Sequence, residues 1–165
     1  MRHTTAPHES RLEQEVTITR VFDAPRELVF KVWTDPEHLA QWWGPHGFTN
    51  PVCEVDLHKG GKMLIHMRGP DGVVYPMSGT FHEIVPPERL VFLSAALDQD
   101  GTPVLESLTT VTFAVHGDRQ TRLTVQARAK GLKPIAAQYL EGMQAGWEQS
   151  LERLEQHLAE SSSAV

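Results

Sequence analysis

The residues best suited to bind a metal are nine histidines and a single cysteine, Cys53. Zinc sites place histidine and cysteine ligands at short, regular spacings. The chain contains no H-E-x-x-H and no H-x-H motif, and His82-Glu83 lacks a second histidine at the required spacing. The sequence therefore predicts no metal site and no cofactor.

Acid–base or nucleophilic catalysis needs a nucleophile beside a base, or paired carboxyl groups. No G-x-S-x-G motif occurs, and Cys53 has no histidine or lysine next to it. Glu83 and Glu106 lie within predicted strands, where an inward-facing carboxyl group would be a candidate base. Charged side chains more often face solvent, so we expect both to point outward and assign no catalytic residue.

The element that must position any site is a predicted C-terminal helix over residues 134–158. Its apolar residues recur at steps of three and four, which places them on one face of a helix. They are Leu140, Met143, Trp147, Leu151, Leu154 and Leu158. Gly142 and Gly146 lie four residues apart on one side of this helix. Their missing side chains either leave room for a ligand beside Trp147 or allow close packing against a sheet, and both readings stay open.

Seven segments before this helix have the alternation or the β-branched content of strands. They are residues 15–22, 52–57, 62–68, 73–85, 90–97, 104–115 and 121–129. Two short helices are expected after the first strand, because Pro25 and Pro36 suit first helical turns. The connections are too short for parallel crossovers, so consecutive strands should pair antiparallel. The predicted fold is α+β, with a curved antiparallel sheet around the C-terminal helix.

Composition limits the class of protein. A chain of 165 residues with 40% hydrophobic and 22% charged residues is typical of one globular domain. We expect that domain over residues 14–159, between flexible tails at 1–13 and 160–165. The net charge of −6 and the lack of a basic run argue against a nucleic-acid partner. The N-terminus lacks the apolar stretch of a signal peptide, no segment has the length of a membrane span, and one cysteine fits a reducing compartment. A cytoplasmic location without membrane insertion is expected.

Three stretches of the sequence resemble a known family. They are VFDAPRELVFKVWTDPEHLAQWWGPHGF (21–48), MRGPDGVVYPMSGTFHEIVPPERLVF (67–92) and GMQAGWEQSLERLEQHL (142–158). They are similar to the START-like (SRPBCC) superfamily. Within it they resemble the bacterial branch related to the C-terminal domain of the activator of the heat-shock protein 90 ATPase. The resemblance implies a helix-grip (Bet v 1-like) fold, in which a cavity lies between the sheet and the C-terminal helix.

The resemblance also implies a function. It suggests binding of a small hydrophobic or aromatic molecule, lipid- or polyketide-like, in that cavity. The residues expected to bind it are Trp42, Met63, Ile65, Met67, Tyr75, Met77, Phe113, Met143 and Trp147. Two alternatives stay open: a cyclase or dehydratase that uses an inward glutamate or histidine in the same cavity, and a protein-interaction module related to chaperone ATPase activators. A homodimer is also open.

Overall fold

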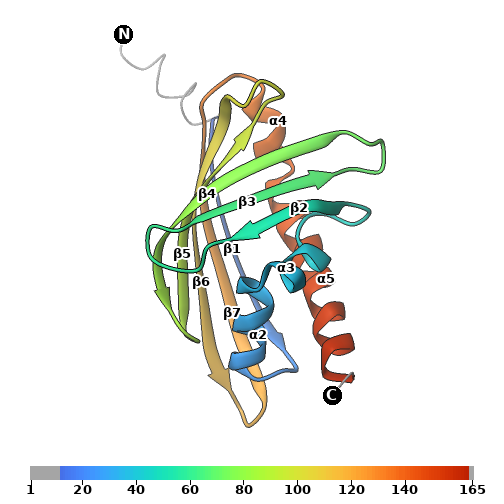
Figure 1. The fold of residues 1–165 in the computed structure, drawn as a ribbon. Helices are drawn as coiled ribbons and strands as arrows, with labels where there is room; N and C mark the ends of the chain where they lie inside the picture. Colours follow the sequence, from blue (N-terminus) through green and yellow to red (C-terminus); the bar gives the residue numbers. More distant parts are fainter. Residues whose placement is uncertain (1–11, 164–165) are drawn as a thin grey trace.

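A seven-stranded antiparallel sheet is the framework of the protein in the computed structural model, which describes residues 12–163 (Figure 1). The strands are β1 (Glu13–Phe22), β2 (Thr49–Val55), β3 (Lys62–Arg68), β4 (Val74–Val85), β5 (Arg89–Leu97), β6 (Pro103–His116) and β7 (Gln120–Gly131). Their spatial order is β1-β7-β6-β5-β4-β3-β2, and every neighbouring pair is antiparallel. The predicted antiparallel pairing of consecutive strands is confirmed from β2 to β7, whereas β1 pairs with β7 at the far edge.

Two short helices separate β1 from β2, as predicted. They are α2 (Arg26–Thr34) and α3 (Pro36–Trp42). Asp35 joins them, because its backbone ends α2 and its side chain accepts a hydrogen bond from the Glu37 backbone N–H at 2.9 Å. This cap satisfies an N–H group that has no partner within the helix, and so supports the start of α3.

The predicted C-terminal helix is divided in two. Helices α4 (Ala136–Glu141) and α5 (Met143–Ser163) are separated by Gly142, whose φ of −90° and ψ of 0° leave the helical range. Glycine weakens a helix because it loses more backbone freedom on folding than any other residue. The prediction of one helix over 134–158 is therefore corrected to two helices over 136–163. None of the helices in the described part of the chain is long and apolar enough to cross a membrane. Residues 1–11 of the predicted N-terminal tail and 164–165 of the predicted C-terminal tail lie outside the described residues, whereas 160–163 belong to α5.

The helices cover one face of the curved sheet, so the fold is the predicted α+β helix-grip arrangement (Figure 1). Phe30 and Trp33 of α2 contact Phe113 of β6, with ring centroids 5.3 and 6.3 Å apart. Leu151 and Leu154 of α5 are fully buried in the same core. Large side chains fill the space between α2, α5 and the sheet around Phe113. Any open space between the helices and the sheet must therefore lie further along the strands.

Candidate ligand-binding cavity

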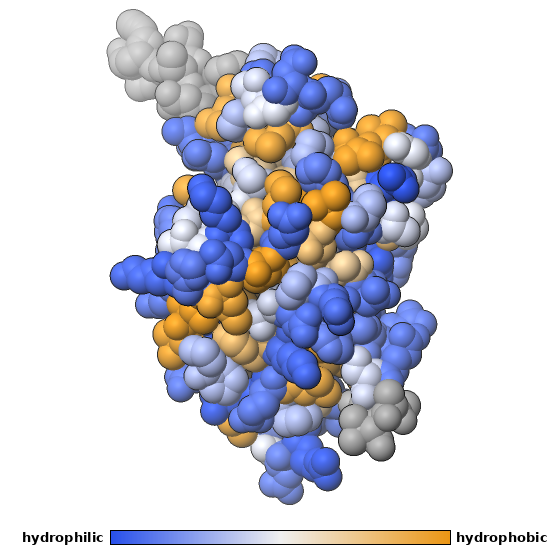
Figure 2. All heavy atoms as spheres, viewed as in Figure 1, coloured by the Kyte–Doolittle hydropathy of each residue, from blue (hydrophilic) through white to orange (hydrophobic). Residues whose placement is uncertain are grey.

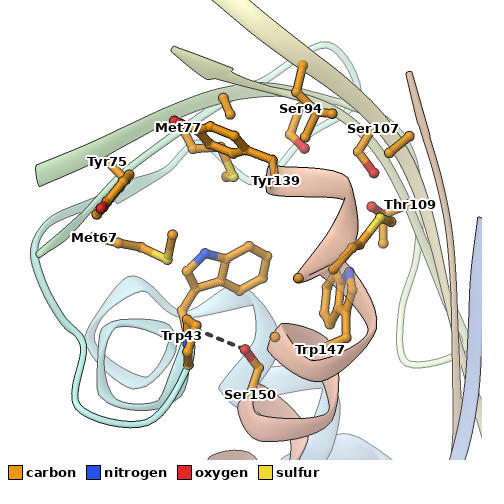
Figure 3. A pocket seen from close by; sticks show the side chains of 18 of the residues that line it. Trp43, Met67, Tyr75, Met77, Ser94, Ser107, Thr109, Tyr139, Trp147 and Ser150 are labelled. Carbon is orange, nitrogen blue, oxygen red and sulfur yellow. Dashed lines mark hydrogen bonds between the residues drawn. The ribbon is translucent and has the colours of Figure 1, made fainter. Parts of the chain in front are cut away.

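A cavity of about 500 Å³ lies between the sheet and the C-terminal helices (Figure 3). The sheet contributes side chains from β3 to β7, the helical side comes from α4 and α5, and the segment after α3 supplies one wall. The sheet residues that line it are Met67, Tyr75, Pro76, Met77, Phe92, Ser94, Ala96, Leu105, Ser107, Thr109 and Ala129. The remaining lining residues are Trp43, Gly44, Pro45, Phe48, Gln138, Tyr139, Gly142, Met143, Gly146, Trp147 and Ser150. The wall is thus mostly apolar.

Short side chains on the sheet create part of this space. One row across β5, β6 and β7 consists of three small residues opposite one another, namely Ser94, Ser107 and Ala129. Residues directly opposite in a sheet share one face. The row two residues away begins with Phe81 and Phe92, whose rings are buried. The sheet surface therefore changes from large to small side chains where the cavity begins.

Glycines on the helical side create the rest. A Cβ atom on Gly146 would meet no other atom within 4 Å, and one on Gly142 would meet only the Gln138 carbonyl oxygen at 3.9 Å. Of the two readings that the sequence left open, the structure favours open space over close packing at these glycines. Gly79 differs, because a Cβ there would lie 3.0 Å from the Met63 Cγ atom. The Met63 side chain thus covers Gly79 and keeps it out of the cavity.

Three hydroxyl groups interrupt the apolar wall at Ser94, Ser107 and Thr109 (Figure 3). Ser94 and Ser107 lie opposite each other on β5 and β6, and Thr109 lies two residues further along β6 on the same face. Ser94 is 9% exposed and Thr109 only 1%. Within residues 12–163, none of these hydroxyl groups makes a hydrogen bond to a protein group. They are free to bond a molecule inside the cavity.

The cavity wall carries no charged side chain. None of the residues that line it is aspartate, glutamate, lysine, arginine or histidine. Tyr75 and Tyr139 contribute phenol groups, and burial, with smaller effects from nearby charges, raises the pKa of Tyr139 above its ordinary value of 10.0. The Tyr139 phenol is therefore neutral at pH 7. Glu83 and Glu106 are both exposed, as the sequence predicted.

Cys53 and the possible metal ligands among residues 12–163 do not form a reactive centre. Burial, with a smaller effect of Glu54, raises the pKa of the Cys53 thiol to about 11, so the nucleophilic thiolate is scarce at neutral pH. No group of three or more histidine, cysteine, aspartate or glutamate residues within residues 12–163 is arranged to hold a metal ion.

The wall formed by residues 43–48 is attached to α5. Arg153 Nη1 donates hydrogen bonds to the carbonyl oxygens of Trp43, Gly44 and Pro45 at 2.9–3.0 Å. Its Nη2 donates to the Gln41 carbonyl at 3.1 Å. The Gly44 N–H donates in turn to Ser150 Oγ at 3.1 Å. A single guanidinium group thus fixes the end of α3 and the segment that carries Trp43 into the cavity.

Comparisons with known proteins identify the family and the fold. Residues 23–159 match the family model described as Activator of Hsp90 ATPase homolog 1-like protein. The chain belongs to this family. The fold is START-like (SRPBCC-like), as the resemblance implied. A search of curated proteins found no match.

Solved structures of bacterial proteins share the fold over nearly the whole chain. A protein from Chromobacterium violaceum is 31% identical, with a TM-score of 0.70, and the alignment covers 86% of this chain and 94% of that protein. The AHSA1 protein from Silicibacter pomeroyi is 26% identical, with a TM-score of 0.75 and coverage of 89% and 99%. A protein from Arthrobacter aurescens is 27% identical, with a TM-score of 0.77 and coverage of 92% and 88%.

The nine residues that were predicted to bind the ligand fall into two groups, according to whether they line the cavity or lie in the core. Five line the cavity: Met67, Tyr75, Met77, Met143 and Trp147. Four lie in the buried core instead: Trp42, Met63, Ile65 and Phe113. Of the three predicted residues on β3, namely Met63, Ile65 and Met67, only Met67 lines the cavity. The Phe113 ring lies against Phe30 and Trp33, and the Met63 side chain covers Gly79.

Of two adjacent tryptophans, Trp43 lines the cavity, and not Trp42, which the sequence predicted. Trp42 is the last residue of α3 and is fully buried, with its Nε1–H donating to the Val32 carbonyl at 2.9 Å. Trp43 lies beyond the helix with φ −64° and ψ 133°, an extended conformation. Because α3 ends between them, the Trp43 side chain leaves the helical phase and lines the cavity (Figure 3).

The three hydroxyl groups and Tyr139 were not among the residues predicted from the sequence. A signal for the hydroxyl groups was present, because Ser107 and Thr109 extend the alternation that places Val111 on the inner face of β6. Polar residues at inward positions of a strand usually have a partner or a function. Nothing in the periodicity identified Tyr139, which depends on the break between α4 and α5.

Proposed function

We propose that the protein binds a small hydrophobic or aromatic molecule in the cavity between the sheet and the C-terminal helices. The observation that carries this proposal is the cavity itself, about 500 Å³ with a mostly apolar wall. Ligand pockets are mainly apolar, have a few polar groups and range from about 300 to 1,000 Å³. Support also comes from the fold, since START-like proteins commonly bind hydrophobic ligands.

The side chains around the cavity suit a flat apolar ligand. Trp43 and Trp147 lie with ring centroids 5.6 Å apart and an interplanar angle of 79°, which leaves two aromatic surfaces at right angles. Met67, Met77 and Met143 provide flexible, polarisable walls that adapt to different ligand shapes. Aromatic rings prefer edge-to-face or offset contact with other rings, so an aromatic ligand gains more here than an alkane of equal area.

Titration with an environment-sensitive apolar dye, followed by tryptophan fluorescence, tests this proposal. Trp43 and Trp147 line the cavity, so their emission should change as the ligand binds. We expect saturable binding by the wild-type protein. The Gly146→Leu variant should lose at least about tenfold in affinity, because the leucine side chain enters open space and removes apolar contact area from the ligand.

Ala145→Leu is the matched control, because Ala145 is the neighbouring helical residue and is exposed. It adds a similar side chain outside the cavity, so its affinity should equal that of the wild type. Circular dichroism should show the same helix content in both variants. Undiminished binding by Gly146→Leu, or an absence of saturable binding by the wild type, would refute the proposal.

Neither alternative function gains support from an observation on the structure. A cyclase or dehydratase of the type considered above needs an inward glutamate or histidine, and neither residue type lines the cavity. A protein-interaction module needs a broad exposed apolar patch. Figure 2 shows hydrophobic residues on one face of the molecule in several groups separated by hydrophilic residues.

A further inference from the structure

Ser94, Ser107 and Thr109 place their hydroxyl groups on the sheet side of the cavity, its closed end, where Ser107 is half-buried. Ser94, Thr109 and the neighbouring Phe92 are buried, with 9%, 1% and 2% of their surfaces exposed. On the opposite side of the cavity, Gln138 and Gly142 are exposed. A ligand that enters past the exposed residues therefore reaches the three hydroxyl groups with its leading end.

From this geometry we infer that the ligand is uncharged and carries a carbonyl or hydroxyl group at the end that enters first. This inference rests on the proposed function and specifies the chemical class of the ligand. Ser94 and Ser107 are opposite partners on neighbouring strands, so their Cβ atoms lie about 4.5–5.5 Å apart. One ligand oxygen placed between them can accept a hydrogen bond from each, and Thr109 offers a third donor from the next position.

A purely apolar ligand fits this end of the cavity poorly. It would displace water from three hydroxyl groups that have no partner among the described protein groups, and a buried polar group without a hydrogen bond is unfavourable. A hydroxyl group can both donate and accept, so the cluster accepts ketones, esters and alcohols alike. The site thus selects for a neutral polar tip without selecting one functional group.

A charged ligand fits poorly for a different reason. A carboxylate at the closed end would lose its water, and no lysine, arginine or histidine lines the cavity to offset that charge. An ammonium group would meet the same difficulty, because no aspartate or glutamate lines the cavity. The ligand class is therefore an aromatic or alicyclic ketone, ester or alcohol, and not a fatty acid or an amine.

Three naphthalene probes of nearly equal shape test the inference. They are 2-acetylnaphthalene with a neutral carbonyl tip, 2-isopropenylnaphthalene with an apolar tip, and 2-naphthoate with an anionic tip at pH 7. Their affinities are measured by displacement of the apolar dye. We expect 2-acetylnaphthalene to bind at least about tenfold more tightly than either of the others, which corresponds to the loss of one to two buried hydrogen bonds.

The triple variant Ser94→Ala/Ser107→Ala/Thr109→Val should abolish the preference for 2-acetylnaphthalene over 2-isopropenylnaphthalene while it still binds 2-isopropenylnaphthalene. Thr110→Val is the matched control, since Thr110 is the next residue on β6 and does not line the cavity. It should keep the wild-type preference. Unchanged melting midpoints show that both variants are folded.

Each contrary outcome has a distinct meaning. Equal binding of the three probes, tighter binding of 2-naphthoate, or an undiminished preference of the triple variant for 2-acetylnaphthalene over 2-isopropenylnaphthalene overturns the inference while the proposed function stands. Failure of 2-acetylnaphthalene to displace a dye that does bind also overturns it. Failure of the dye and all three probes to bind overturns the proposed function together with the inference.

Discussion

Replacement of Arg153 by methionine should destabilise the protein and weaken ligand binding together. Arg153 donates to four backbone carbonyl oxygens, those of Gln41, Trp43, Gly44 and Pro45, at 2.9–3.1 Å. Methionine retains most of the apolar stem but removes every donor. Three of these bonds are part-buried and one is exposed, so the carbonyls can regain some bonds to water, and a net loss of about 0.5–1 kcal/mol per bond gives about 2–4 kcal/mol in total.

Urea denaturation measures this loss. With a slope of about 2 kcal/mol per M for a domain of this size, the midpoint should fall by about 1–2 M. Arg153→Lys should recover only part of the loss, because an ammonium group lacks the planar fork that reaches several carbonyls at once. Dye affinity should fall in Arg153→Met, since the segment with Trp43 loses its attachment to α5.

An exposed arginine on β7 provides the control. Arg128→Met also removes one positive charge, but from an exposed position on β7. It should shift the urea midpoint by less than about 0.3 M. If Arg153→Met and Arg128→Met show the same midpoint, the four bonds do not stabilise the folded state and the reasoning is wrong. A large loss of stability with unchanged dye affinity would show that Trp43 is positioned by other contacts.

Three further results are expected. Trp42→Ala should lower the free energy of unfolding by about 3–5 kcal/mol, because Trp42 is fully buried. Trp147→Ala should lower it by less, because Trp147 is only partly buried. Equal losses of stability in thermal melts of the two variants would contradict this. Burial, and secondly the charge of His38, lowers the pKa of His157 below 6.5, so the unfolded state binds the proton first and stability should fall as pH drops from about 6.5 through the lowered pKa. The His157→Gln variant should lose that part of the pH dependence in urea midpoints. Gly44→Ala should cost at least about 1 kcal/mol, because φ is +97° and the new Cβ would lie 2.9 Å from Met67 Sδ, and an unchanged melting midpoint would show that the segment adapts freely.

Much of the sheet could be predicted because its signals are local. The alternation of residues 62–68 defines β3 at both of its ends, and Pro36 marks the first residue of α3. The break at Gly142 was harder to predict, because the apolar steps of three and four continue across it. Gly142 lowers the helix propensity of the predicted C-terminal helix, but only the tertiary structure shows that two helices replace one.

The cavity depends on relations that a single sequence does not contain. Trp42 and Trp43 differ by one residue, and helix ends are uncertain by at least that much. The row that includes Ser94 and Ser107 arises from the register between β5 and β6, which is a contact between segments distant in the chain. The apolar pocket was therefore expected only from the resemblance to a known family, and neither that resemblance nor the periodicity indicated its polar end.

The pairing of β1 with β7 has a consequence for how the protein folds. Residues 13–22 hydrogen-bond with residues 121–130, so the edge of the sheet is completed by segments separated by about a hundred residues. During synthesis, β1 emerges first and has no strand partner until β7 has left the ribosome. Long-range pairing of this kind slows folding and leaves an unpaired strand edge open to association with other chains. Nascent chains that end before residue 121 should therefore depend on chaperones more than the full-length protein does.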